Sequence, residues 1–179
     1  VGAQIKKRVL ASFQSLQERN EVVSMFGEQV SPEIMDELLA HRSGLESQKR
    51  YVCVMFLDIR NFTAFAEKRE PEQVVAYQNA VFTLMIEAVT RHHGIINQFL
   101  GDGFMATFGA PISHGNDSEN AVAAAREIIS TIKLESESGN IPSTRVGIGL
   151  HAGEAVTGNV GSSLRKQFTI TGNVVILAS

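Results

Sequence analysis

This 179-residue chain has a single cysteine, no long apolar run and no excess of positive charge. Its only cysteine, Cys53, lies in the apolar run YVCVMFL, so a small buried side chain is predicted. A single cysteine excludes a disulfide framework and favours a reducing, cytoplasmic compartment. No apolar run approaches the roughly 20 residues that cross a bilayer, and no signal peptide is visible, so a soluble piece is expected. The formal net charge is −3, so no basic field recruits nucleic acid.

The chain is long enough for one domain of ordinary size plus an extension. Near its start, apolar residues spaced three and four apart predict either a short coiled-coil seam or an amphipathic helix lying on the domain. A second short helix is predicted to begin at Ser31, with Pro32 in its first turn. We assign residues 1–46 to signalling or linker helices and residues 47–179 to the main domain. The sequence begins with Val1 and ends in a helix-like pattern, so we expect a longer parent chain.

From residue 50 onward, the hydrophobic pattern alternates between strands and helices. It predicts a central strand over RYVCVMFLDI, a helix that begins at Pro71, and a hairpin whose turn holds Gly101, Asp102 and Gly103. A helix over DSENAVAAAREIISTIK, a Gly-rich strand pair over RVGIGLHAGEAVTGNVG, a strand over KQFTIT and a further helix from GNVVILAS follow. This βαββαβ order predicts an α/β sheet with its helices on one face.

Two aspartates in this pattern occupy positions where they can meet. Asp58 ends the first strand, and Asp102 lies at the hairpin tip between Gly101 and Gly103. Either aspartate alone more often caps a helix or shapes a turn. If the strand and hairpin are neighbours, the two carboxylates repel each other unless a cation or a shared proton lies between them. Mg²⁺ and Mn²⁺ prefer such oxygen ligands, often together with substrate phosphates, and the flanking glycines leave room for a ligand.

The segment RNFTAF follows Asp58 and is predicted to begin a helix. The free N–H groups at this start, around Asn61, Phe62 and Thr63, would bind phosphate oxygens. A divalent metal beside a helix start indicates a nucleoside triphosphate as the ligand. No convincing Ser/His/Asp or Cys/His arrangement points to a side-chain nucleophile.

Four motifs, FLDIRNFT, NQFLGDGFMATFGAP, GIGLHAGEAVTGNVGS and QFTITGNVVILAS, resemble those of the class III nucleotidyl cyclase catalytic domain of bacterial type. The upstream FGEQVSPEIMDELL is similar to the segment that joins bacterial members to sensory modules. The resemblance implies a ferredoxin-like fold that forms a homodimer, with the active site between the chains. It implies conversion of a nucleoside triphosphate to its 3′,5′-cyclic monophosphate and pyrophosphate. It also implies two Mg²⁺ or Mn²⁺ ions bound by Asp58, Asp102 and the backbone of Ile59, which would activate the 3′-hydroxyl and neutralise the departing pyrophosphate.

Base preference and activity depend on three further positions that match the family motifs. In the family, a Lys with an Asp or Thr favours adenine, and a Glu with a Cys favours guanine. Here the positions hold Gln98, which suits either purine, and Thr169, which belongs to the adenine pattern, so ATP is favoured over GTP. Ile176 replaces the usual Asn that orients the ribose, and the Arg expected four residues later falls after Ser179. Weak activity, or a metal-bearing half of an asymmetric pair, is expected as a result.

Several functions stay open on the sequence alone. The first is an adenylate cyclase homodimer controlled by the N-terminal helix, with guanylate cyclase as the alternative substrate choice. The second is a signalling module without turnover, which binds nucleotide or only transmits the geometry of the dimer to neighbouring domains. A diguanylate cyclase or polymerase-like relative is disfavoured because the GGDEF pattern is absent. Membrane attachment is expected only through upstream segments.

Overall fold

The computed structural model describes residues 14, 16–17, 20, 47–161 and 166–179. The elements in chain order are β1 (Gln48–Ile59), α3 (Phe62–Ala66), α4 (Pro71–Arg91), β2 (Ile95–Phe99), β3 (Gly103–Phe108), α5 (Asp117–Glu137), β4 (Val146–Gly161), β5 (Lys166–Thr171) and α6 (Asn173–Ala178). Apart from isolated positions, the helices expected over residues 1–46 lie outside the described residues. They stay predictions, as does the domain boundary that follows them.

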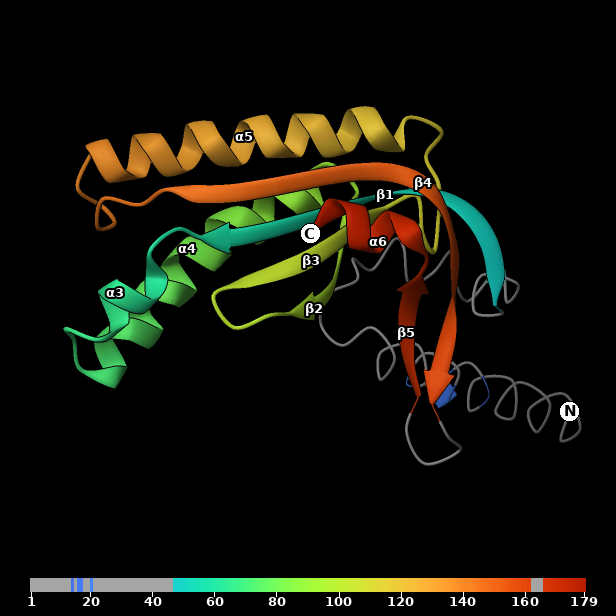
Figure 1. Ribbon diagram of the computed structural model, residues 1–179, viewed down its shortest axis with the longest axis horizontal. Helices are drawn as coiled ribbons and strands as arrows, with labels where there is room; N and C mark the ends of the chain where they lie inside the picture. Colours follow the sequence, from blue (N-terminus) through green and yellow to red (C-terminus); the bar gives the residue numbers. More distant parts are fainter. Residues whose placement is uncertain (1–13, 15, 18–19, 21–46, 162–165) are drawn as a thin grey trace, which may run out of the picture.

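The five strands form one sheet in the order β2-β3-β1-β4-β5, and every neighbouring pair is antiparallel (Figure 1). The first four strands with α4 and α5 follow the βαββαβ order, which confirms the predicted ferredoxin-like α/β fold. The prediction of a Gly-rich strand pair is wrong, because Val146–Gly161 is one 16-residue strand. It is this long because its first part pairs with β1 and its last part with β5.

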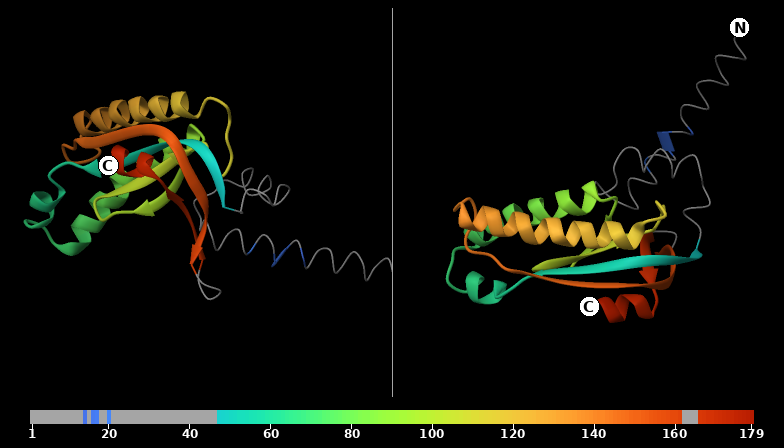
Figure 2. Two further views of the ribbon diagram at one scale, coloured as in Figure 1. Left: turned by 45° about the vertical axis from the view of Figure 1, so that its right-hand side comes forward. Right: turned by 90° about the horizontal axis from the view of Figure 1, so that it is seen from above.

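Helices lie on both faces of the sheet, so the expectation that they share one face is wrong. The long helices α4 and α5 cover one face, and the short α6 lies on the other (Figure 2). Side chains alternate along β1: Met55 and Leu57 join the core under α4 and α5, whereas Val52 and Val54 pack with α6. As predicted, β1 is buried on both faces.

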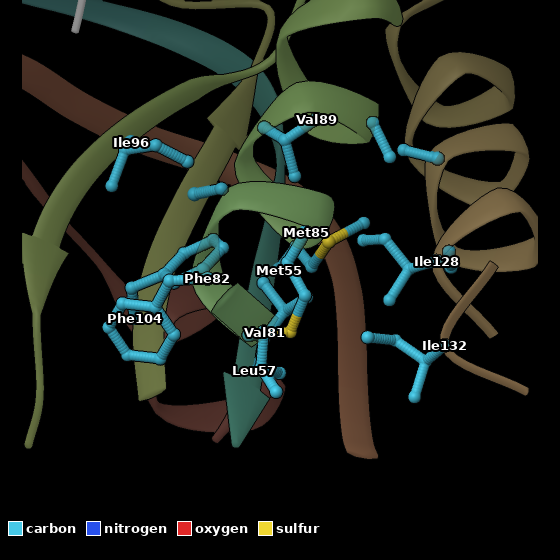
Figure 3. Close-up of a cluster of buried hydrophobic side chains, with 14 of the residues drawn as sticks. Met55, Leu57, Val81, Phe82, Met85, Val89, Ile96, Phe104, Ile128 and Ile132 are labelled. Carbon is cyan, nitrogen blue, oxygen red and sulfur yellow. The ribbon is translucent and has the colours of Figure 1, made fainter. Parts of the chain in front are cut away.

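The larger core lies between the sheet and the two long helices (Figure 3). Its labelled members are Met55, Leu57, Val81, Phe82, Met85, Val89, Ile96, Phe104, Ile128 and Ile132. Burying each such side chain contributes about 1.5–3 kcal/mol. Cys53 belongs to this core, and burial, with a smaller contribution from the charge of Asp117, raises the pKa of its thiol to about 11. In the described part of the chain, no helix has the length and apolar content needed to cross a membrane.

Gly103 should tolerate no larger side chain, because a Cβ there would overlap the backbone carbonyl of Leu57. We expect Gly103→Ala to lower the free energy of unfolding by about 2–4 kcal/mol, since backbone cannot move aside without disturbing the β1–β3 ladder. Gly153→Ala is the matched control: its Cβ would meet only Val174, at an ordinary 3.6 Å. Urea denaturation followed by circular dichroism measures both variants. Equal midpoints for the two would contradict the prediction.

Candidate active site

The structure brings Asp58 and Asp102 to the same end of the sheet. Asp58 is paired with Gly103 across the β1–β3 ladder, so Asp102 immediately precedes the residue opposite Asp58. The amide of Ile59 donates a hydrogen bond to the carbonyl of Asp102 at 3.0 Å. Neighbouring strands lie about 4.8 Å apart, so the two aspartates are close neighbours in the backbone. Asp58 has 44% of its side chain exposed and Asp102 is half-buried, which leaves both open to a ligand from solvent.

The turn that carries Asp102 is held by one left-handed backbone conformation and two hydrogen bonds. Gly101 has a φ of 75°, a left-handed conformation that favours glycine. The amide of Leu100 donates to the carbonyl of Gly103 at 2.8 Å, which closes the hairpin. The side chain of Gln78 on α4 donates from Nε2 to the carbonyl of Gly101 at 2.6 Å. Sequence reasoning missed Gln78, because no local spacing signals that a helix side chain reaches a turn 23 residues later.

The helix predicted after Asp58 exists but is short. α3 has five residues, and its N-cap, Asn61, takes a left-handed conformation with φ 61°. The ring of Phe65 stacks on Tyr77 with centroids 4.0 Å apart, and Phe62 stacks on the same ring at 6.4 Å. The ring of Phe62 therefore has a packing role. Asn61 and Thr63 are exposed at the start of the helix.

Arg60 is a second residue that sequence reasoning missed. Its Nε lies 3.3 Å from Oδ1 of Asp58, and its amide donates to the carbonyl of Arg145 at 2.9 Å. The guanidinium lies over Gly147, where a Cβ would collide with it. Arg60 and Asp58 share a face because they are two residues apart at the end of a strand, and that spacing is the signal that could have predicted the pair.

The remaining predicted residues are dispersed over other elements. Gln98 is exposed on β2, and Thr169 is half-buried on β5, at opposite ends of the strand order. Ile176 on α6 is 72% exposed. Among the described residues, no hydrogen bond or ring contact joins these three side chains to one another or to Asp58.

α6 runs along β4 toward the end of the sheet that holds the aspartates. Val174 packs over Gly153, and the carbonyl of Ala178 lies against Gly149, where a Cβ would overlap it. Gly147, two residues further along the same face, is paired with Asp58. The alternating glycines of β4 therefore admit α6 and Arg60 close to the sheet, which explains why this strand is rich in glycine.

The donor set fits a hard divalent cation. Asp58 and Asp102 offer carboxylate oxygens, the ligands that Mg²⁺ and Mn²⁺ prefer, and the two residues paired with Asp58 are glycines, Gly103 and Gly147. Within the ranges that the structure describes, no group of three or more His, Cys, Asp or Glu side chains could form a metal cage. Two carboxylates leave coordination positions for water and substrate phosphates, so the site suits an ion that arrives with, or is completed by, a phosphate ligand.

Comparisons with known proteins show which proteins this chain is similar to. Residues 45–179 match the family model of the adenylate and guanylate cyclase catalytic domain. The uncharacterized protein Rv1318c of Mycobacterium tuberculosis is 36% identical over 160 residues, which cover 89% of this chain and 29% of the relative. The chain thus spans less than a third of that relative's length.

Two solved structures are similar over most of their own length. The crystal structure of the guanylyl cyclase Cya2 has a TM-score of 0.69 and 33% identity, covering 75% of this chain and 70% of that one. The crystal structure of the adenylyl cyclase CyaB from P. aeruginosa has the same TM-score and 30% identity, covering 75% of this chain and 71% of that one. The likeness therefore extends to cyclases of both base preferences.

Proposed function

Because this chain belongs to the adenylate and guanylate cyclase catalytic domain family, we propose that it converts ATP to 3′,5′-cyclic AMP and pyrophosphate at a site between two copies of the chain. The observation that carries the proposal is the pairing of Asp58 with Gly103, which places Asp58 beside Asp102. These carboxylates, with the backbone carbonyl of Ile59, would hold two Mg²⁺ or Mn²⁺ ions. Such ions supply positive charge that favours ionisation of the 3′-hydroxyl and neutralises the leaving pyrophosphate.

The chain's own residues supply position and charge, with no covalent intermediate. The attacking hydroxyl belongs to the substrate, so the protein has to hold the nucleotide folded for in-line attack on the α-phosphorus. Hydrogen bonds from Ile59 and Gln78 hold the backbone of the Asp102 turn in place, which serves this need. Asn61 and Thr63 are exposed next to Asp58, where backbone N–H groups can meet phosphate oxygens.

The preference for ATP is argued from two residues. Thr169 matches the adenine pattern of the family, and the amide of Gln98 can donate to or accept from either purine. Both side chains have surface open to a ligand. The guanylyl and adenylyl cyclase structures are about equally similar to this chain, so GTP is the alternative substrate.

The homodimer is supported by the outer surface of α6. Ile176 and Leu177 are consecutive aliphatic residues that are 72% and 64% exposed. They belong to α6, which is the only helix on its face of the sheet among the described residues. Burying both against a second copy would remove this apolar surface from water.

The proposal is tested by identifying the product. A chain that continues past Ser179 is incubated with Mn²⁺ and either ATP or GTP, and the cyclic products are separated by chromatography. We expect cyclic AMP to form faster than cyclic GMP. Faster formation of cyclic GMP would reverse the base assignment and keep the chemistry. Nucleotide binding without either product would select a signalling module without turnover, the second candidate, which the exposed apolar Ile176 favours.

A further inference from the structure

Asp58 already has a cationic partner within the chain. Arg60 lies two residues away, and its Nε is 3.3 Å from Oδ1 of Asp58. Both side chains are about half exposed, with 59% of Arg60 and 44% of Asp58 accessible. A cation that binds Asp58 from solvent therefore meets a positive charge at the same carboxylate.

The position of Arg60 is determined by the neighbouring strand. Its amide is bonded to the carbonyl of Arg145, which joins the end of β1 to the residue just before β4. Its guanidinium lies against Gly147, the β4 residue paired with Asp58. Any side chain at residue 147 would occupy the space of the guanidinium, so the glycine provides the surface on which Arg60 reaches Asp58.

We propose that Arg60, seated on Gly147, is a built-in counter-ion of Asp58 that lowers the affinity of the Asp58–Asp102 site for a divalent cation. The proposal rests on the proposed function, because it assumes that these two aspartates bind metal. Arg60 then sets the cation concentration at which the site fills. It acts through the charge of Asp58 and has no assigned contact with the reacting atoms.

The expected size follows from electrostatics. A single positive charge about 6 Å from a divalent ion in water weakens its binding by about tenfold, and screening at physiological ionic strength reduces this effect. Removing the charge of Arg60 should therefore tighten divalent cation binding by about three- to tenfold.

The test measures Mn²⁺ binding to the nucleotide-free protein by isothermal titration calorimetry, so it needs no enzymatic turnover. We expect Arg60→Gln to lower the Mn²⁺ dissociation constant by about three- to tenfold. Lys49→Gln is the matched control, because Lys49 is also an exposed cation on β1 paired with a carboxylate, Glu154. It lies nine residues from Asp58, about 30 Å along the strand, where its charge is screened. Unchanged or weaker Mn²⁺ binding in Arg60→Gln would overturn the proposal, as would equal tightening in Lys49→Gln.

A second variant moves the charge without removing it. Gly147→Ala places a methyl group where the guanidinium lies, and the flexible end of Arg60 can give way without disturbing backbone. We expect tightening in the same direction as Arg60→Gln. If Arg60→Gln tightens binding and Gly147→Ala does not, the contact of the Arg60 guanidinium with Gly147 is not required and that part of the proposal fails.

The same titration separates this proposal from the proposed function. Mn²⁺ binding that disappears in Asp58→Asn establishes the metal site, whatever Arg60 does. If that site exists and Arg60→Gln leaves its affinity unchanged, only the counter-ion role is lost. If neither the wild-type protein nor Arg60→Gln binds Mn²⁺ in the absence of nucleotide, the counter-ion proposal fails, and the product assay alone decides the proposed function.

Discussion

Replacing Asp58 or Asp102 with Asn should reduce cyclic nucleotide formation by on the order of 10³-fold or more while the protein stays folded. Asn keeps the size of the side chain and removes the charge that we propose holds a hard cation, so we expect catalysis to be lost and the fold to be kept. Asp58 is 44% exposed and Asp102 is half-buried, so we expect either substitution to change the free energy of unfolding by less than about 1 kcal/mol. Initial rates with Mn·ATP and urea denaturation measure the two effects separately.

The matched control is Glu154→Gln, which removes an exposed carboxylate of β4 that pairs with Lys49. It should leave the rate unchanged. The double variant of Asp58 and Asp102 sharpens the result. If both carboxylates hold the same ions, each single substitution already disables the metal site. The double variant should then be scarcely slower than either single variant. A single variant that retains most of the wild-type rate would remove the carboxylate pair from the mechanism.

The proximity of Asp58 and Asp102 could be predicted because each aspartate belongs to a strong local sequence pattern. Asp58 closes an apolar run that only a central strand explains, and Asp102 lies in a glycine-flanked turn between two short apolar runs. Once the run and the hairpin are neighbours in one sheet, the chain direction brings both aspartates to one end. The topology therefore determines the backbone of the candidate site.

The contacts that hold this pair could not be predicted in the same way. The reach of Gln78 to Gly101 depends on how α4 is placed over the sheet, which is a tertiary result. The Gly-rich segment RVGIGLHAGEAVTGNVG predicts a strand pair, whereas the structure has one strand there. In the structure, Gly147 and Gly149 lie on one face of a single strand, where Arg60 and α6 approach closely. That approach also explains why α6 lies on the face opposite α4 and α5.

Ile176→Asn should raise the rate of cyclisation by up to about 10²-fold, if Ile176 occupies the ribose position. A preorganised hydrogen-bond donor at such a position contributes on the order of 10²–10³ in rate, and isoleucine offers none. The variant should keep nearly the free energy of unfolding of the wild type, because Ile176 is 72% exposed and Asn and Ile have similar helix propensities. Initial rates with Mn·ATP measure the gain.

Leu177→Asn is the matched control for this gain. Leu177 is the next residue of α6 and is 64% exposed, so its replacement changes polarity in nearly the same way, at a somewhat larger cost in helix propensity. Both substitutions remove apolar surface from the proposed dimer contact, so a gain seen in Ile176→Asn and not in Leu177→Asn points to a contact with the substrate. A gain in kcat with an unchanged KM would show that the introduced amide acts in the transition state, whereas a lower KM alone would show ground-state binding. Equal rates for wild type and Ile176→Asn would exclude Ile176 from the ribose position, because the missing donor would then have no substrate group to meet.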